Sequence, residues 1–183
     1  MHCEASKKCE SSCTGGKCKL ECNNANTELC EQTCAHGACD IKCTAMNCES
    51  SCSGGQCANF KCTAGENCTQ FCGHNCTNMR CKAQECDQTC TKGNCKMYCE
   101  SGSGMCIMSC PGGNCKLHCN GSKCKRDCSG GGCVLSGSGV EVEKPKPTFT
   151  EAPKPKGSAS GPMSGALALF VPAIAYILSV YEY

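Results

Sequence analysis

Apolar and polar positions alternate in short runs along the first 135 residues, and cysteine supplies most of the apolar positions. The stretch CESSCTGGKCKLEC, residues 9–22, has four cysteines in the spacing C-x3-C-x4-C-x3-C, with Gly-Gly between the halves. Cys18, Leu20 and Cys22 lie two residues apart, so on a β-strand all three share one face. The pattern therefore predicts two short strands joined by a tight corner, where glycine adopts a positive φ at little cost.

This pattern occurs in seven copies, and each copy begins 18 to 21 residues after the previous one. The copies are CESSCTGGKCKLEC (9–22), CEQTCAHGACDIKC (30–43), CESSCSGGQCANFKC (48–62), CTQFCGHNCTNMRC (68–81), CDQTCTKGNCKMYC (86–99), CIMSCPGGNCKLHC (106–119) and CKRDCSGGGCVLSG (124–137). An apolar side chain always stands two residues before the fourth position: Leu20, Ile41, Phe60, Met79, Met97, Leu117 and Leu135.

A period of about 18–20 residues suits one coil of a β-solenoid, in which coils stack about 4.8 Å apart. The sequence therefore predicts an all-β, disulfide-stapled β-solenoid of about seven short coils over residues 1–135. A string of independent stapled hairpins is the alternative. A single hairpin cannot bury its apolar residue, whereas stacking joins the apolar residues into a continuous stripe, so we favour the solenoid.

Composition changes the expected source of stability. The chain has 28 cysteines and 21 glycines among 183 residues. Up to residue 135 the only aromatic side chains are Phe60, Phe71 and Tyr98, too few for a conventional core of this size. We expect disulfides to replace such a core, as in small secreted scaffolds.

A flattened coil places its two strands face to face, which predicts two disulfides within each coil. The corner pairs would be Cys13–Cys18, Cys34–Cys39, Cys52–Cys57, Cys72–Cys76, Cys90–Cys95, Cys110–Cys115 and Cys128–Cys133. The outer pairs would be Cys9–Cys22, Cys30–Cys43, Cys48–Cys62, Cys68–Cys81, Cys86–Cys99 and Cys106–Cys119. Links between successive coils are the alternative, because sequence alone does not settle connectivity.

The ends of the array predict two odd thiols. Met1-His2-Cys3 resembles the tail of an earlier copy, and Gly137 replaces the fourth cysteine of the last copy. Cys3 and Cys124 are then without partners in their own coils. No secretory signal precedes Cys3, so we expect that the chain lacks its true N-terminus or that Met1 is internal to a longer product.

Beyond the repeats the composition shifts twice. Residues 136–165 are rich in Pro, Lys, Gly and Ser, which predicts a disordered linker. Residues 166–183 form a short hydrophobic tail without a following basic cluster. The tail and the small residues before it resemble a GPI-attachment signal, with attachment candidates Ser158, Ala159, Ser160 and Gly161. A single-pass membrane helix is the alternative, and both place the repeats outside the cell.

Three sequons agree with a secreted chain. They are Asn67-Cys68-Thr69, Asn75-Cys76-Thr77 and Asn120-Gly121-Ser122, and Asn120 is the best candidate for N-glycosylation because it lies in a connector. The simpler interpretation is that these asparagines are turn residues.

The cysteine spacing disfavours other chemistry. No two cysteines are closer than four positions, so the C-x-x-C unit of zinc knuckles and redox sites is missing. Metal-thiolate binding is therefore a minor alternative. The four histidines show no pairing with a nucleophile or carboxylate, so we expect no enzyme and no cofactor or small-molecule substrate. A net charge of +2 without a basic, aromatic-rich stripe disfavours nucleic acid.

A secreted cysteine-repeat chain with a hydrophobic C-terminal tail resembles the cysteine-rich proteins of the coral skeletal organic matrix. The resemblance is compositional: galaxins, which belong to that matrix, carry adjacent Cys-Cys pairs, and this chain has none. It implies an extracellular structural role in or beside a mineralised skeleton. We expect a disulfide-crosslinked rod tethered at the cell surface, with other matrix components or itself as partners. A cell-surface binding or adhesion module is the alternative.

Overall fold

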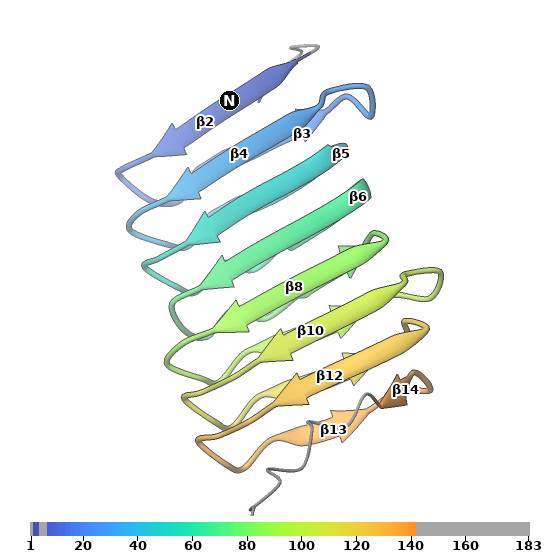
Figure 1. Cartoon of the computed structure of the whole chain (residues 1–183). Coiled ribbons are helices and arrows are strands. Elements are labelled where there is room, and N and C mark those ends of the chain that lie inside the picture. The colour runs from blue at the N-terminus through green and yellow to red at the C-terminus, as the bar shows by residue number, and fades with distance from the viewer. Residues whose placement is uncertain (1, 4–6, 142–183) are drawn as a thin grey trace, which may run out of the picture. The chain divides into compact units, whose positions relative to one another are not determined.

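The repeats fold into a parallel β-solenoid. The computed structural model describes residues 2–3 and 7–141, and the side chains from residue 7 onward. Within these residues it contains 14 strands and no helix, so no helix there could cross a membrane. Successive strands of each wall stack side by side along the solenoid (Figure 1). The predicted fold of about seven short coils is confirmed. The predicted linker beyond Glu141, the tail and the GPI candidates lie outside the described residues.

Each coil contributes one strand to each of two walls. The wall facing the viewer in Figure 1, here the first wall, carries the first and second cysteines of each copy. It consists of β2 (Lys8–Cys13), β4 (Leu29–Cys34), the second half of β5 (Asp40–Cys52), the second half of β6 (Phe60–Cys72), β8 (Glu85–Cys90), β10 (Met105–Ser109), β12 (Lys123–Asp127) and β14 (Val140–Glu141).

The second wall carries the third and fourth cysteines. It consists of β1 (His2–Cys3), β3 (Lys19–Asn23), the first halves of β5 and β6, β7 (Met79–Lys82), β9 (Lys96–Cys99), β11 (Lys116–Cys119) and β13 (Val134–Ser136). Because β5 and β6 run through both walls, all strands belong to one continuous sheet.

Corresponding positions of the repeat lie directly beside one another along each wall. Every strand pair is parallel, and cysteine pairs with cysteine, as in Cys9 with Cys30 and Cys30 with Cys48. The pairing continues past residue 135, because β13 pairs with β11 and β14 pairs with β12. The solenoid therefore extends to Glu141, into residues that the sequence pattern assigned to the linker.

The interior has two different linings. From the second wall, the apolar residue of each coil points inward, and six of the seven are at most 1% exposed; Leu135, in the last coil, is 54% exposed. From the first wall, the residue between the two cysteines points inward, and it is polar in most coils. This inner column consists of Ser11, Gln32, Ser50, Gln70, Gln88, Met108 and Arg126.

Hydrogen bonds compensate the buried amides of this column. Gln70 Nε2 donates across the interior to the carbonyl of Phe60, at 2.7 Å, and Gln88 Nε2 donates to Gln70 Oε1, also at 2.7 Å. Gln32 Nε2 donates to the Lys42 carbonyl in the same way, at 3.1 Å. The bonds from Gln70 and Gln32 tie the two walls together, the bond from Gln88 joins neighbouring coils of the first wall, and all three satisfy donors that would otherwise be costly to bury.

Two corners join the walls. The first corner lies between the second and third cysteines and contains the predicted left-handed glycine in six coils: Gly16, Gly37, Gly55, Gly93, Gly113 and Gly131. The following residue is also left-handed, for example Lys17 and Asn94. A Cβ added at Gly93 would overlap the carbonyl oxygen of Gly113 in the next coil. Glycine is thus required both by φ and by the close stacking of corners.

Candidate functional site

Disulfides close the first corner of every coil. The seven pairs are Cys13–Cys18, Cys34–Cys39, Cys52–Cys57, Cys72–Cys76, Cys90–Cys95, Cys110–Cys115 and Cys128–Cys133. Their Cα atoms are 6.2 to 6.5 Å apart, within the usual range of about 4.4–6.8 Å. The predicted corner pairs are confirmed.

The second corner, between the fourth cysteine of one copy and the first cysteine of the next, is closed by disulfides between successive coils, which was the alternative to the predicted outer pairs. The pairs are Cys43–Cys48, Cys62–Cys68, Cys81–Cys86, Cys99–Cys106 and Cys119–Cys124. The predicted outer pairs Cys30–Cys43, Cys48–Cys62, Cys68–Cys81, Cys86–Cys99 and Cys106–Cys119 are therefore wrong, and Cys9–Cys22 is wrong because Cys22 is a free thiol.

The rise of the chain along the solenoid explains this pairing. The chain leaves each coil at the fourth cysteine and reaches the next coil's first cysteine after a short connector. Their Cα atoms are 6.0 to 6.3 Å apart and separated by five to seven positions. The first cysteines of neighbouring coils stack in register, so a fourth cysteine lies near the first cysteine of its own coil and near that of the next coil. Only the three-dimensional path of the chain selects between these two partners.

The expected odd thiols are also partly wrong. Cys124 pairs with Cys119, and Cys9 is disulfide-bonded as well. The side chain of Cys3 lies outside the described residues. Within them, the free thiols are Cys22 and Cys30, both buried. They occupy the fourth and first positions around the longest connector, where the two cysteines are eight positions apart.

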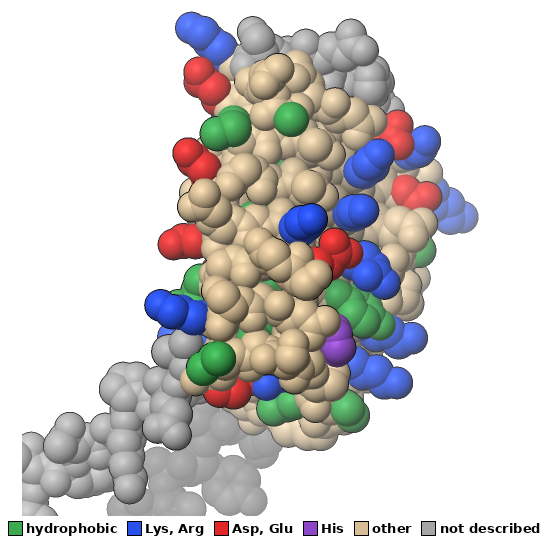
Figure 2. All heavy atoms as spheres, turned by 90° about the vertical axis from the view of Figure 1, so that its right-hand side faces the viewer, with side chains coloured by type: hydrophobic (Ala, Val, Ile, Leu, Met, Phe, Trp, Pro, Cys, Tyr) green, Lys and Arg blue, Asp and Glu red, His purple; other side chains and the backbone are tan. Residues whose placement is uncertain are grey.

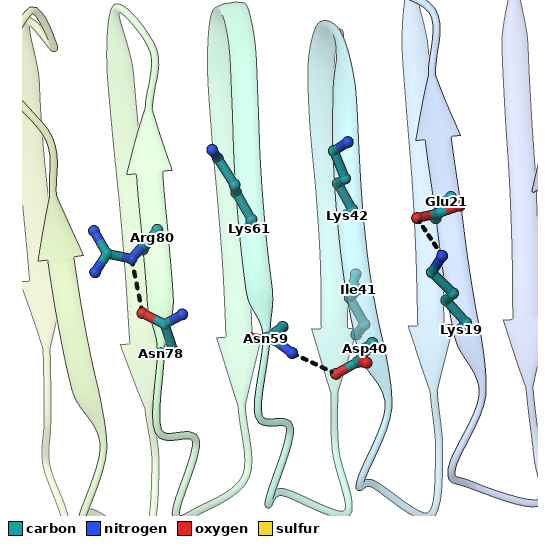
Figure 3. Close-up of a pocket in the computed structure, with 9 residues that line it drawn as sticks. All are labelled: Lys19, Glu21, Asp40, Ile41, Lys42, Asn59, Lys61, Asn78 and Arg80. Carbon is teal, nitrogen blue, oxygen red and sulfur yellow. Dashed lines mark hydrogen bonds and ion pairs between the residues drawn. The ribbon is translucent and has the colours of Figure 1, made fainter.

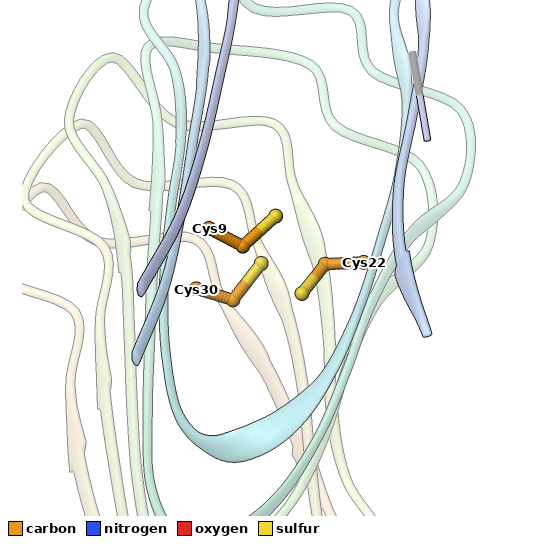
Figure 4. A group of neighbouring side chains, drawn as sticks. All are labelled: Cys9, Cys22 and Cys30. Carbon is orange, nitrogen blue, oxygen red and sulfur yellow. The ribbon is translucent and has the colours of Figure 1, made fainter. Parts of the chain in front are cut away.

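Cys22 and Cys30 lie on opposite walls, and Cys9 is the neighbour of Cys30 on the first wall (Figure 4). All three sulfur atoms lie within 4.8 Å of one another. Burial, and then the hydrogen bond to Cys22, raises the pKa of the Cys30 thiol well above its usual range. Cys30 is therefore held as an unreactive thiol at neutral pH.

The same three cysteines do not form a closed zinc site. Because Cys9 is in a disulfide, the cluster offers two thiols, whereas structural zinc takes four ligands. The other close groups of cysteines that the described residues form, such as Cys34 with Cys52 and Cys57, are stacked disulfides. Their sulfur atoms are near one another because the coils stack.

The sequons occupy three different environments. Asn67 is exposed, and its Nδ2 donates to Asn47 Oδ1 at 2.9 Å. Asn75 is an exposed first-corner residue with φ 54°. Asn120 is half-buried, its Nδ2 lies 2.9 Å from His118 Nε2, and its Oδ1 accepts from the Ser138 backbone N–H at 3.1 Å. The side chain of Asn120 is thus the most engaged of the three.

Stacking also aligns the charges on the outer surfaces. Glu10, Glu31 and Glu49 are successive residues of one outer column on the first wall, here called the acidic ladder. Two of them share one cation: Lys8 Nζ lies 2.6 Å from Glu10 and 3.2 Å from Glu31, and these contacts raise the pKa of Lys8.

Asp87, two coils beyond Glu49 in the same column, has its pKa raised by burial.

The second wall carries a matching column of opposite charge. Lys42, Lys61 and Arg80 are successive in-register residues, here called the basic ladder. They line a hollow that spans four coils, and in Figure 3 Lys42 and Lys61 point the same way, parallel to each other. Among the described residues neither lysine has a carboxylate within ion-pair distance.

Arg80 is held more firmly than the two lysines. Its Nε donates to Asn78 Oδ1 at 2.8 Å, and Nη1 lies 3.3 Å from Glu100. The guanidinium carbon lies 4.7 Å from the centroid of the Tyr98 ring in the next coil. This cation–π contact fixes the end of the basic ladder.

Two of the histidines, His36 and His118, contact residues of neighbouring coils. His118 lies next to Ser136 in register, with Nδ1 2.9 Å from Ser136 Oγ. His36 Nδ1 contacts the carbonyl of Thr14 on the preceding first corner. These contacts join stacked coils, and no carboxylate is among the hydrogen-bond partners found for either ring in the described part of the chain.

Comparisons with known proteins add no relative. No protein-family model, no curated protein and no solved structure matches this chain. Its functional interpretation therefore depends on the fold and the side chains described above. The extensive disulfides indicate a secreted or extracellular protein, and the disulfide-rich solenoid is compatible with an extracellular structural protein.

Proposed function

We propose that this chain is an extracellular structural protein, a disulfide-crosslinked rod that is tethered at the cell surface and contributes to an extracellular matrix. The observation that carries the proposal is the closure of both corners along the rod by disulfides. Short covalent loops restrict the unfolded chain, and parallel ladders join every coil to its neighbours. The described residues then resist unfolding although they bury few large side chains.

The proposal assigns no catalytic step and no cofactor to the chain. Tethering depends on the hydrophobic tail, either through a GPI anchor or as a membrane helix. The resemblance to coral skeletal matrix proteins supports a place in a mineralised organic matrix, where a rod that resists reduction and proteolysis is useful. A cell-surface adhesion module is the second hypothesis, and it predicts a soluble partner that saturates at one-to-one stoichiometry.

The first experiment is a disulfide map. The chain is produced in a eukaryotic secretory host, its intact mass is measured before and after reduction, and the links are located by peptide mass spectrometry. We expect a metal-free chain with pairs of the Cys52–Cys57 and Cys62–Cys68 types. Mostly free thiols that carry zinc or copper would overturn the structural role and favour metal-thiolate binding.

A further inference from the structure

The two outer faces of the solenoid carry ladders of opposite charge and equal spacing. Each ladder consists of three side chains on three consecutive coils, and the strand register places each residue directly beside the next. In Figure 2, viewed along an edge of the solenoid, a column of acidic side chains runs along one side, and most Lys and Arg side chains lie on the other side, with several acidic side chains among them. The two faces point in opposite directions.

Like charges in register are unfavourable within one molecule. Residues directly beside each other on parallel strands are about 4.8 Å apart, and like charges at such positions destabilise a sheet. Lys8 forms ion pairs with Glu10 and Glu31 and so reduces the repulsion between them. Among the described residues, Glu49, Lys42 and Lys61 have no ion-pair partner. These ladders therefore gain from a partner that presents the opposite charge at the same spacing.

We propose that a second copy of this chain is that partner: the acidic ladder of one rod packs along the basic ladder of the next. The spacing argues for a copy of the chain, because another rod repeats its charges at the same coil-to-coil distance. The acidic ladder lies on the first to third coils and the basic ladder on the second to fourth. Rods that run in the same direction therefore align these charges when displaced by one coil.

The contact joins two different surfaces, so in a pair of rods each rod retains one unused ladder, on the side that faces away from its partner. Such a heterologous contact does not close into a dimer and extends into a sheet or bundle. Individual exposed ion pairs contribute only about 0.2–1 kcal/mol, so association requires several in register and weakens with salt. This inference rests on the proposed structural role and states how separate rods would join.

The test uses charge reversal on each face. One variant carries Lys42→Glu, Lys61→Glu and Arg80→Glu, and the other carries Glu10→Lys, Glu31→Lys and Glu49→Lys. The full oxidised chain and each variant are compared by sedimentation velocity in neutral detergent at low ionic strength. We expect the wild-type chain to associate and each variant alone to lose at least about tenfold in association constant.

Mixing provides the decisive measurement. The first variant has two acidic faces and the second has two basic faces, so an equimolar mixture should associate again although neither does alone. Matched controls reverse three lysines outside the ladders (Lys17→Glu, Lys82→Glu and Lys92→Glu) or three glutamates near the second corner (Glu28→Lys, Glu66→Lys and Glu85→Lys). These controls change the net charge equally and should associate like the wild-type chain.

Three results would overturn the proposal: a wild-type chain that stays monomeric, variants that associate as the wild type does, or a mixture that fails to associate. If the wild-type chain is monomeric but binds a sulfated polysaccharide through the basic ladder alone, the partner is an anionic polymer. The disulfide map is independent of these outcomes. A wild-type chain that has the expected disulfide map but does not associate would reject the lateral contact and leave the proposed rod unaffected.

Discussion

At the scale of single residues, the interior combines side chains that seldom form a core. Cysteine and one apolar residue per coil fill the narrow space between the walls, together with a buried amide or hydroxyl in each of the first five coils. The amides of Gln32 and Gln70 span this space and bind backbone carbonyls of the opposite wall. Gln88 Oε1 and Ser11 Oγ find no partner among the described residues, so the column is not fully satisfied.

The free pair Cys22 and Cys30 gives a prediction at this scale. Both thiols are buried, and burial also keeps Cys30 protonated, so a thiol reagent at pH 8 should modify neither cysteine in the folded chain within the time that labels an unfolded control fully. In denaturant without reductant, mass spectrometry should find two added groups, located on these residues.

The pH dependence has a definite sign. Since the pKa of Cys30 is raised on folding, the folded state holds this proton more tightly than the unfolded state. The contribution of this proton to the free energy of unfolding is complete below the ordinary thiol pKa of about 8.5, and it is lost progressively as the pH rises above that value. Labelling of the folded chain should therefore accelerate in alkaline buffer. Rapid labelling at pH 8 would contradict this account, and no labelling in denaturant would mean that the pair forms a disulfide.

At the scale of elements, the first corner sets how closely coils stack. Its glycine has a positive φ, and the corner of the next coil lies against it, so the same residue type satisfies both requirements at Gly37, Gly55 and Gly93. The residue after it, such as Ala38 or Asn94, is left-handed as well, which costs about 1–2 kcal/mol for an ordinary residue. The corner disulfide and the strand ladders hold this conformation in place.

Replacing a corner glycine tests this requirement. Gly93→Ala should destabilise the chain by at least about 1–2 kcal/mol, because Gly93 has φ 81° and its Cβ would overlap Gly113. The measurement is guanidinium unfolding of the oxidised chain, followed by circular dichroism.

Gly15→Ala is the matched control. Gly15 is also a first-corner glycine, but its φ is not positive and an added Cβ meets nothing within 4 Å. The control should leave the unfolding midpoint nearly unchanged. Equal losses in the two variants would show that close stacking of the corners is not what requires glycine.

At the scale of the whole solenoid, each coil contacts its neighbours and little else. The stability of such an array is approximately a sum of coil terms and nearest-neighbour terms. A central coil has two neighbours and an end coil has one. The cysteines of the central staple Cys72–Cys76 are buried, whereas those of the last staple, Cys128–Cys133, are half-buried.

Removal of one staple at a time tests this additive description. Cys128→Ser with Cys133→Ser should cost about 2 kcal/mol, the loop-closure term for a short loop. Cys72→Ser with Cys76→Ser should cost more, because each buried hydroxyl left without a partner adds about 1–3 kcal/mol. The measurement is guanidinium unfolding under non-reducing conditions. Equal costs at the two positions would contradict a stability that depends on burial and neighbours.

The sequence by itself determined the repeat, the inward positions and the first-corner staples. Alternation at a period of two fixes which side chains share a face, and Cys13 and Cys18 are close in any tight corner. The parallel register also follows, because only stacking buries Leu20 and its equivalents. These features depend on local geometry and on one repeated pattern.

Only the tertiary structure decided the second-corner pairs and the charged faces. A first cysteine such as Cys48 lies near both Cys43 and Cys62, and the choice depends on how the chain rises from coil to coil. Spacing does not encode that rise. In the sequence, the ladders that contain Glu10 and Lys42 are outward positions with no evident charge pattern. Charges 18 to 21 residues apart become neighbours only when the coils stack in register.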